Sequence, residues 1–336
     1  MTKRILVIAA LAAVAIAPVA AQEAETPEYK WTKGDTIHYR LDIQKVSKAT
    51  GAQQAEVDQT WFYLYDAEVK DVAPDGTAAI QVKFGPAGVR FQIPAKNIDF
   101  SYDPGNPEDE KRAGSPLALP FVALRGETIT YRVAKTGKLL GLEGLQELFQ
   151  KIGEKVKAAP QGAGYYGIAM TALDDLRTTQ VETMFRRLPE KPLKPGETSY
   201  KSPKIRESNP AVGNVLLQSQ CTIKADAGSP ADAWSIACEI ARTPEPPAAG
   251  APPAPGKLAE TKASSEFLLA KNGGAMLKNV YTSVLAVEQT LPPAANADPA
   301  APPATVTQRD EITAKLERQA EAAPPAAPPA EPPAGS

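Results

Sequence analysis

The two cysteines of the chain, Cys221 and Cys238, are the residues whose chemistry is easiest to assign. Apolar and polar residues alternate on both sides of a turn predicted at Gly228-Ser229-Pro230-Ala231, and this register places Cys221 directly opposite Cys238. We therefore predict a structural disulfide within a hairpin, with two buried free thiols as the alternative. No Cys-x-x-Cys spacing marks a redox centre.

Catalytic chemistry has little support among the other residues. The single histidine, His38, lies in an alternating segment beside Tyr39, and no Gly-x-Ser-x-Gly elbow supplies it with a nucleophile. One histidine also excludes His-x-x-x-His zinc spacing, and no glycine-rich phosphate loop follows a predicted strand. We expect no catalytic, cofactor-binding or metal-binding residues, and a protein that is not an enzyme.

Acidic residues offer two weaker candidates. An oxygen-rich loop could hold calcium, but its residues lack the EF-hand order, so a solvated acidic loop is the preferred interpretation. Its members are Asp99, Asp103, Asn106, Glu108, Asp109 and Glu110. The adjacent pair Asp174 and Asp175 falls in a predicted helix, where neighbours point in different directions and do not form a glycosidase pair. A place in the first helical turn explains both carboxylates.

The start of the chain predicts export. Lys3 and Arg4 precede an apolar run from Ile5 to Ala17, and Val19-Ala20-Ala21 is a small-residue cleavage site. The run is shorter than the roughly 20 residues that a membrane anchor needs. We expect a signal peptide over residues 1–21, a periplasmic or extracellular protein, and no transmembrane helix after cleavage.

Alternating residues predict a mainly β protein. The clearest hairpin runs from Trp61 to Phe84 around a turn at Ala73-Pro74-Asp75-Gly76, and it sets Tyr65 opposite Phe84 and Ala67 opposite Val82 on one apolar face. The fold class expected is α+β, a curved antiparallel sheet built from hairpins with two or three helices. A two-sheet β-sandwich is the alternative.

The chain also resembles itself, because GDTIHYRL at residues 34–41 returns as GETITYRV at residues 126–133. Two duplicated halves, about 29–160 and 190–291, would explain the recurrence, and repeated use of the same turn chemistry is the alternative.

Two helices are expected between these halves. One apolar stripe predicts the first helix, with Leu142, Leu145, Phe149, Ile152 and Val156 at helical spacing. A weaker stripe containing Leu173 and Leu176 predicts a second helix, which Thr171 and Asp174 cap and which ends at Arg186-Arg187. We expect both stripes to contact the core instead of a membrane surface.

Proline sets the expected domain boundaries. The chain has 33 prolines, concentrated in the loop at residues 243–256 and in the tail at residues 292–336. Such Pro/Ala segments cannot bury a core, so we expect a β-rich domain over residues 22–291 and a disordered tail that holds only a marginal helix at residues 306–321. The net charge of -2 shows no basic excess for nucleic acid.

Several spaced motifs resemble an uncharacterised family of exported bacterial proteins. They are Ser115-Pro116-Leu117-Ala118, residues 123–126 and 130–144, and the stretch from Leu188 to Thr198. The opening segment from Trp31 to Leu41 and the turn Asp75-Gly76-Thr77-Ala78 resemble the family too, so the resemblance extends over most of Tyr29 to Leu291. The resemblance implies export and a β-rich fold, with no established activity or catalytic residues to carry over.

These observations favour a non-enzymatic exported envelope protein without a cofactor. Its curved sheet would bind an apolar ligand such as a lipid or acyl chain. The alternative is a scaffold or protein-interaction module of the cell envelope, in which a sheet edge or the Pro/Ala arm contacts a partner.

Overall fold

The computed structural model describes residues 26–192, 199–202, 204–209, 212–224, 232–246, 254, 256–291 and 304–320. The predicted signal peptide and the turn at residues 228–231 lie outside the described residues. The described strands are β1 (Thr36–Gly51), β2 (Ala55–Val72), β3 (Ala78–Ile93), β4 (Ile98–Tyr102), β5 (Thr128–Val133), β6 (Leu139–Glu143), β7 (Ser199–Lys201), β8 (Ile205–Asn209), β9 (Gly213–Ile223), β10 (Ala233–Pro244), β11 (Gly256–Ala270), β12 (Met276–Thr290) and β13 (Thr305–Arg318).

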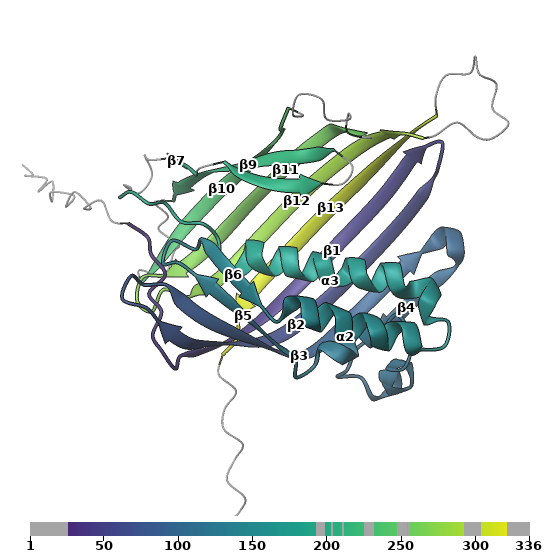
Figure 1. The fold of residues 1–336 in the computed structure, drawn as a ribbon, viewed down its shortest axis with the longest axis horizontal. Helices are drawn as coiled ribbons and strands as arrows, with labels where there is room; N and C mark the ends of the chain where they lie inside the picture. The colour runs from purple at the N-terminus through teal and green to yellow at the C-terminus, as the bar shows by residue number, and fades with distance from the viewer. Residues whose placement is uncertain are drawn as a thin grey trace, which may run out of the picture.

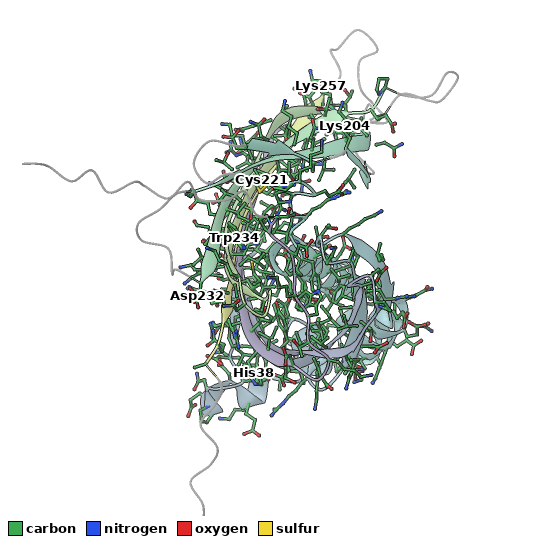
Figure 2. All side chains as sticks on the ribbon, turned by 90° about the vertical axis from the view of Figure 1, so that its left-hand side faces the viewer. His38, Lys204, Cys221, Asp232, Trp234 and Lys257 are labelled. Atoms are coloured by element: carbon green, nitrogen blue, oxygen red, sulfur yellow. A yellow bond between two sulfur atoms is a disulfide. The ribbon has the colours of Figure 1, made fainter. Side chains whose placement is uncertain are left out.

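All of these strands belong to one antiparallel sheet. Its order is β6-β5-β3-β2-β1-β13-β12-β11-β10-β9-β7, with β4 also paired to β3 and β8 also paired to β9. The sheet is strongly curved, and its two ends, β6 and β7, are not hydrogen-bonded to each other (Figure 2). The predicted mainly β, hairpin-built sheet is confirmed, and the described strands form one sheet instead of the two that a sandwich needs.

Helices cover one face of this sheet. The α-helices are α1 (Leu119–Leu124), α2 (Leu145–Ala158) and α3 (Gly162–Met184), and short 3-10 helices occupy η1 (Pro94–Lys96) and η2 (Pro107–Arg112). Figure 1 shows α2 and α3 side by side across the strands. None of the helices in the described ranges is long and apolar enough to cross a membrane.

The core lies between the helices and the sheet. Because side chains alternate along a strand, every second residue of the long strands faces the helices. On β1 these include Tyr39, Leu41 and Ile43, each at most 1% exposed, and Tyr63 and Tyr65 continue the buried layer on β2. Burial of an aliphatic side chain such as Leu41 or Ile43 contributes about 1.5–3 kcal/mol of transfer free energy, so this layer is a major source of stability.

The predicted register of the β2–β3 hairpin is confirmed. Tyr65 pairs with Phe84, Ala67 with Val82 and Val69 with Ile80. Gly76 in the connecting turn has a φ of +83°, a conformation that glycine adopts without strain. The GDT-like motifs begin β1 and β5, and whether they record a duplication stays a prediction.

The C-terminal segment corrects one expectation. We predicted disorder over residues 292–336 with a marginal helix at 306–321, but residues 305–318 form β13. This strand pairs with β1 on one side and β12 on the other, so yellow β13 lies between purple β1 and green β12 in Figure 1. Ile312 and Leu316 fit a helical stripe and an alternating strand equally well. The segment forms a strand because, as β13, it pairs with the backbone N–H and C=O groups of both β1 and β12.

The helix boundaries need a smaller correction. Leu142 lies in β6, before the first long helix. The second helix, α3, begins at Gly162, so Thr171 and Asp174 do not cap its start. Thr171 lies inside the helix, where its hydroxyl donates a hydrogen bond to the Gly167 carbonyl at 2.9 Å. The polar residues that suggested a cap therefore occupy the exposed side of a longer helix.

Candidate functional site

A cleft of about 440 Å³ lies in the gap between the two ends of the sheet, where the end of α3 meets β6 on one side and β8 to β10 on the other. This volume is within the range typical of small-molecule sites. Its lining residues are Gly137, Lys138, Leu139, Val181, Glu182, Phe185, Arg186, Arg187, Ser202, Lys204, Ile205, Leu217, Ser219 and Ile240.

One wall of this cleft is apolar. Val181 and Phe185 come from the end of α3, and Leu217 and Ile240 come from β9 and β10. Phe185 is fixed by ring contacts, because its centroid lies 5.0 Å from that of Tyr131. Ile205 pairs with Leu217 and remains 47% exposed. The end of α3 and strands β8, β9 and β10 thus all contribute apolar side chains to the cleft.

Arg186 is the most deeply buried of the charged residues that line the cleft. It is only 6% exposed although it carries a full charge. Its Nη1 pairs with the Glu182 carboxylate, and its Nη2 lies 3.4 Å from the Ser219 hydroxyl. Its Nε is buried and has no hydrogen-bond partner among the described residues. A buried guanidinium with an unused donor is costly to maintain, which points to a role beyond packing.

The β5–β6 turn holds this arginine in place. A Cβ at Gly137 would lie 2.1 Å from the Arg186 carbonyl oxygen, and the φ of Gly137 is +76°. Only glycine permits so close an approach in that conformation. The Arg186 carbonyl also accepts a hydrogen bond from the Tyr29 hydroxyl at 3.1 Å. Two segments far apart in sequence therefore position the end of α3.

Cations dominate the charged residues that line the cleft. They are Lys138, Arg186, Arg187 and Lys204 against the single carboxylate of Glu182, so four positive charges and one negative charge give a formal net of +3. The whole chain has a formal net charge of -2. Positive charge is thus concentrated in the cleft.

Arg187 pairs at 3.3 Å with Glu190, whose side chain is 52% exposed, and the Arg187 Nε has no partner among the described residues.

Polar contacts fix α3 above the sheet. The Asn279 amide on β12 donates to the Thr183 carbonyl at 2.9 Å, and the Tyr131 hydroxyl on β5 donates to the Gln180 side chain at 2.6 Å. Farther along the helix, the Lys45 ammonium on β1 lies 2.7 Å from the Asp175 carboxylate. Burial raises the pKa of Asp175 above its ordinary value, and Lys45 partly offsets that effect.

The two adjacent aspartates do point in different directions, as expected. Asp174 is exposed and pairs with Arg177 at 2.8 Å, whereas Asp175 is mostly buried against Lys45. Their predicted place in a first helical turn is wrong, because α3 begins at Gly162. No local pattern reveals the Lys45 partner, which comes from a strand 130 residues earlier.

The predicted disulfide is present. Cys221 on β9 and Cys238 on β10 are directly opposite each other and bonded, with an S–S distance of 1.94 Å and a Cα–Cα distance of 4.0 Å. Ser219 and Ile240, which line the cleft, are each two residues from a bonded cysteine and face each other in the register. The disulfide therefore ties together the two strands that form the outer wall of the cleft.

His38 has a partner that sequence reasoning missed. Its Nδ1 lies 2.6 Å from the Asp66 carboxylate, because the two residues pair across β1 and β2. The pairing of the two strands would have revealed this carboxylate. Both side chains are exposed, and Figure 2 shows His38 at the opposite end of the molecule from Lys204 of the cleft. The pair therefore lies outside the site.

The acidic loop uses its oxygens locally. Asp109 accepts a hydrogen bond from the Asp103 backbone at 3.0 Å and pairs with Arg112 at 3.3 Å. Asp103 in turn accepts from the Gly105 backbone at 2.8 Å. Within the described ranges, no three His, Cys, Asp or Glu side chains are grouped so that they could hold a metal ion.

A second cleft, of about 460 Å³, lies on the opposite face of the sheet around the Phe62 ring. A Cβ at Gly88 would lie 2.4 Å from this ring, so the glycine makes room for it. The Arg40 guanidinium lies 4.6 Å from the ring centroid. The charges that line the cleft, Asp42, Asp103, Arg90 and Lys315, cancel, so this surface lacks the charge bias of the first cleft.

Residues 75–215 match the model of a family of unknown function, DUF6263. The predicted resemblance to an uncharacterised family is therefore confirmed. The DUF6263 match contains α3, β6 and most of the residues that line the cleft, whereas Leu217, Ser219 and Ile240 lie beyond it. The DUF6263 description supplies neither an activity nor a ligand.

No curated protein sequence matches the chain. A structure of lipovitellin described under "Lipid-protein interactions in lipovitellin" aligns at a TM-score of 0.42 and 9% identity over 89% of this chain and 26% of the lipovitellin chain. DynF from the dynemicin biosynthesis pathway of Micromonospora chersina aligns at a TM-score of 0.18 and 8% identity over 88% and 86% of the two chains. At these TM-scores neither likeness indicates a shared function.

Proposed function

We propose that this protein is a non-enzymatic exported binding protein that holds an apolar chain, such as the acyl chain of a lipid, in the cleft between β6 and β8–β10. One observation carries the proposal: the gap between the two ends of the sheet is lined by Val181, Phe185, Leu217 and Ile240 and remains open. Water in contact with such a wall is displaced favourably by hydrocarbon.

The energetic scale is adequate for a binding site. Each methylene that leaves water contributes about 0.8 kcal/mol, so a chain with eight buried methylenes would gain about 6 kcal/mol before the costs of association. Ile205, at 47% exposed, and Leu140, at 51% exposed, are the most exposed large apolar side chains of the described residues. Ile205 lines the cleft and Leu140 does not, which makes the two a matched pair for experiment.

Export is supported by independent features. A disulfide persists in oxidising compartments, and the signal peptide predicted over residues 1–21 would send the chain to one. A protein that carries an acyl chain between compartments or membranes of the envelope would need a pocket of this kind.

The test combines native mass spectrometry with calorimetry. Protein purified from the producing cells without detergent should carry a hydrocarbon ligand, and the delipidated protein should bind decanol. Ile205→Asp places a carboxylate against the apolar wall and should weaken decanol binding at least tenfold, or about 1.4 kcal/mol. Leu140→Asp, with the same change in chemistry outside the cleft, should bind like the wild type.

Two outcomes would contradict the proposal. The first is that neither purified protein nor any titration shows a bound chain. The second is that Ile205→Asp and Leu140→Asp bind equally well. An envelope protein that binds tightly to the ligand-free chain would instead favour the alternative role as a scaffold or interaction module.

A further inference from the structure

We infer that the cleft recognises a single-chain amphiphile with an anionic head group, a carboxylate or a phosphate, through the guanidinium of Arg186. The inference rests on the proposed function, because it assigns the head group of the chain that the apolar wall would hold. Its first support is the charge bias of the lining, four cations against one carboxylate. An acyl chain with a neutral head would gain nothing from that bias.

The second support is the state of Arg186. Its Nη1 pairs with Glu182, whereas the other edge of the guanidinium, formed by Nη2 and Nε, has no anionic partner among the described residues. Among the residues that the structure describes, Nη2 contacts only the Ser219 hydroxyl, at 3.4 Å, and the buried Nε has no partner. Two donors side by side match the two oxygens of a carboxylate or phosphate, a bidentate pairing that arginine forms and lysine does not.

The third support is the placement of Ser219. Its backbone is fixed, because its N–H donates to the Ser202 hydroxyl at 2.9 Å and its carbonyl accepts from the Ser202 N–H at 2.7 Å. Its hydroxyl makes the long contact to Arg186 and can rotate away without disturbing the strand. An anion oxygen would take the place of that hydroxyl and replace a weak neutral contact with a charge-assisted hydrogen bond.

The remaining cations would act at longer range. Arg187 and Lys204 line the same cleft as Arg186, and Lys138 lies on the turn that packs against the end of α3. The field of several cations in a partly apolar cleft is stronger than in open water, since few solvent dipoles screen it. They should therefore attract an anionic head group, and added salt should weaken that attraction.

The test compares three ligands with one chain length: decanoate, decyl phosphate and decanol. Calorimetry with the delipidated full-length mature protein should give affinities for one or both anions at least tenfold higher than for decanol. Raising the salt concentration should reduce the anion affinities and leave decanol binding nearly unchanged. The tighter of the two anions then identifies carboxylate or phosphate as the preferred head group.

Variants assign the effect to the arginine. Arg186→Met/Glu182→Gln removes both partners of the buried ion pair, so no carboxylate is left unpaired, and it should abolish the preference for anions while decanol still binds. If that double variant fails to fold, Arg187→Met provides the test, and it should reduce the preference for anions without abolishing it. Arg90→Met, a matched change beside the second cleft, should bind all three ligands like the wild type.

The outcomes separate the two ideas. If decanol binds as tightly as both anions, or if the anion preference is as large as in the wild type in both Arg186→Met/Glu182→Gln and Arg187→Met, the inference is overturned while the proposed function stands. If none of the three ligands binds to the wild type, the proposed function itself fails.

Discussion

Replacement of Leu316 by alanine tests whether the C-terminal segment belongs to the core. Leu316 is 0% exposed, and its Cα partners are Leu41 on β1 and Asn279 on β12. Leu-to-Ala changes in cores cost about 2–5 kcal/mol, and the cost is highest where the surroundings cannot collapse into the cavity. Since strands on both sides hold the backbone of β13, we expect a loss of about 3–5 kcal/mol.

The assay is urea unfolding of the mature protein followed by tryptophan fluorescence. Thr313→Ala is the control, because Thr313 lies on the same strand with its side chain exposed, and it should cost less than about 1 kcal/mol. The Leu316→Ala variant should unfold at a lower urea concentration with an unchanged slope. Its Tm should fall by about 10 °C, from the scaling of roughly 2–4 °C per kcal/mol in a domain of this size.

The result that would refute this reasoning is an equal, small effect of both substitutions. Residues 305–318 would then contribute nothing to the core, and the tail predicted from composition would be correct after all. Truncation after Leu291 gives the same information in a stronger form, because it leaves β1 and β12 without the strand that pairs with both of them. We expect that truncated chain to lose its cooperative unfolding transition.

Two further predictions concern contacts that position the cleft. Lys45→Met should destabilise the protein by about 3 kcal/mol at neutral pH because it leaves the Asp175 carboxylate buried without its cation, and Lys45→Met/Asp175→Leu should recover most of that loss. Burial raises the pKa of Asp175 in the folded state above its value in the unfolded state. The loss in unfolding free energy caused by Lys45→Met should therefore be complete above the folded-state pKa and should shrink as the pH falls toward the unfolded-state pKa. Chemical denaturation at several pH values would measure it. Finally, Cys221→Ala/Cys238→Ala should cost up to about 3 kcal/mol and weaken binding in the cleft, and a full-strength site without the disulfide would contradict its assigned role.

Local alternation was enough to predict two hairpins of the sheet. The β2–β3 hairpin and the Cys221–Cys238 pairing both follow from counting outward from one turn, because a one-residue slip would move every apolar residue to the wrong face. The pairing of β1 with β13 spans more than 250 residues of chain, and no local pattern specifies it. Composition was misleading there, since the prolines that flank β13 suggested a tail without a core.

The cleft could not be predicted for a related reason. Its residues lie between Gly137 and Ile240 on elements that meet only when the sheet curves, and none of them forms a recognisable motif. By sequence alone, Arg186 and Arg187 are charges that suit the end of a helix. In the structure Arg186 lies one residue beyond the C-cap of α3 and is buried, so its helix-dipole role does not account for its position.

The shape of the cleft depends on how α3 is held, since the helix end provides one wall and the strands provide the other. Contacts from three separate strands hold α3: Lys45 on β1, Tyr131 on β5 and Asn279 on β12. Asn279 is itself 0% exposed and accepts a hydrogen bond from Ser265 at 2.8 Å, so its orientation is fixed. Buried polar contacts of this kind add little net stability, but they penalise any shift that leaves a partner unsatisfied. A helix that slid by one turn would break all of them together. The gap between β6 and β8–β10 should therefore exist before a ligand arrives. The binding free energy should then not be reduced by the cost of forming the gap.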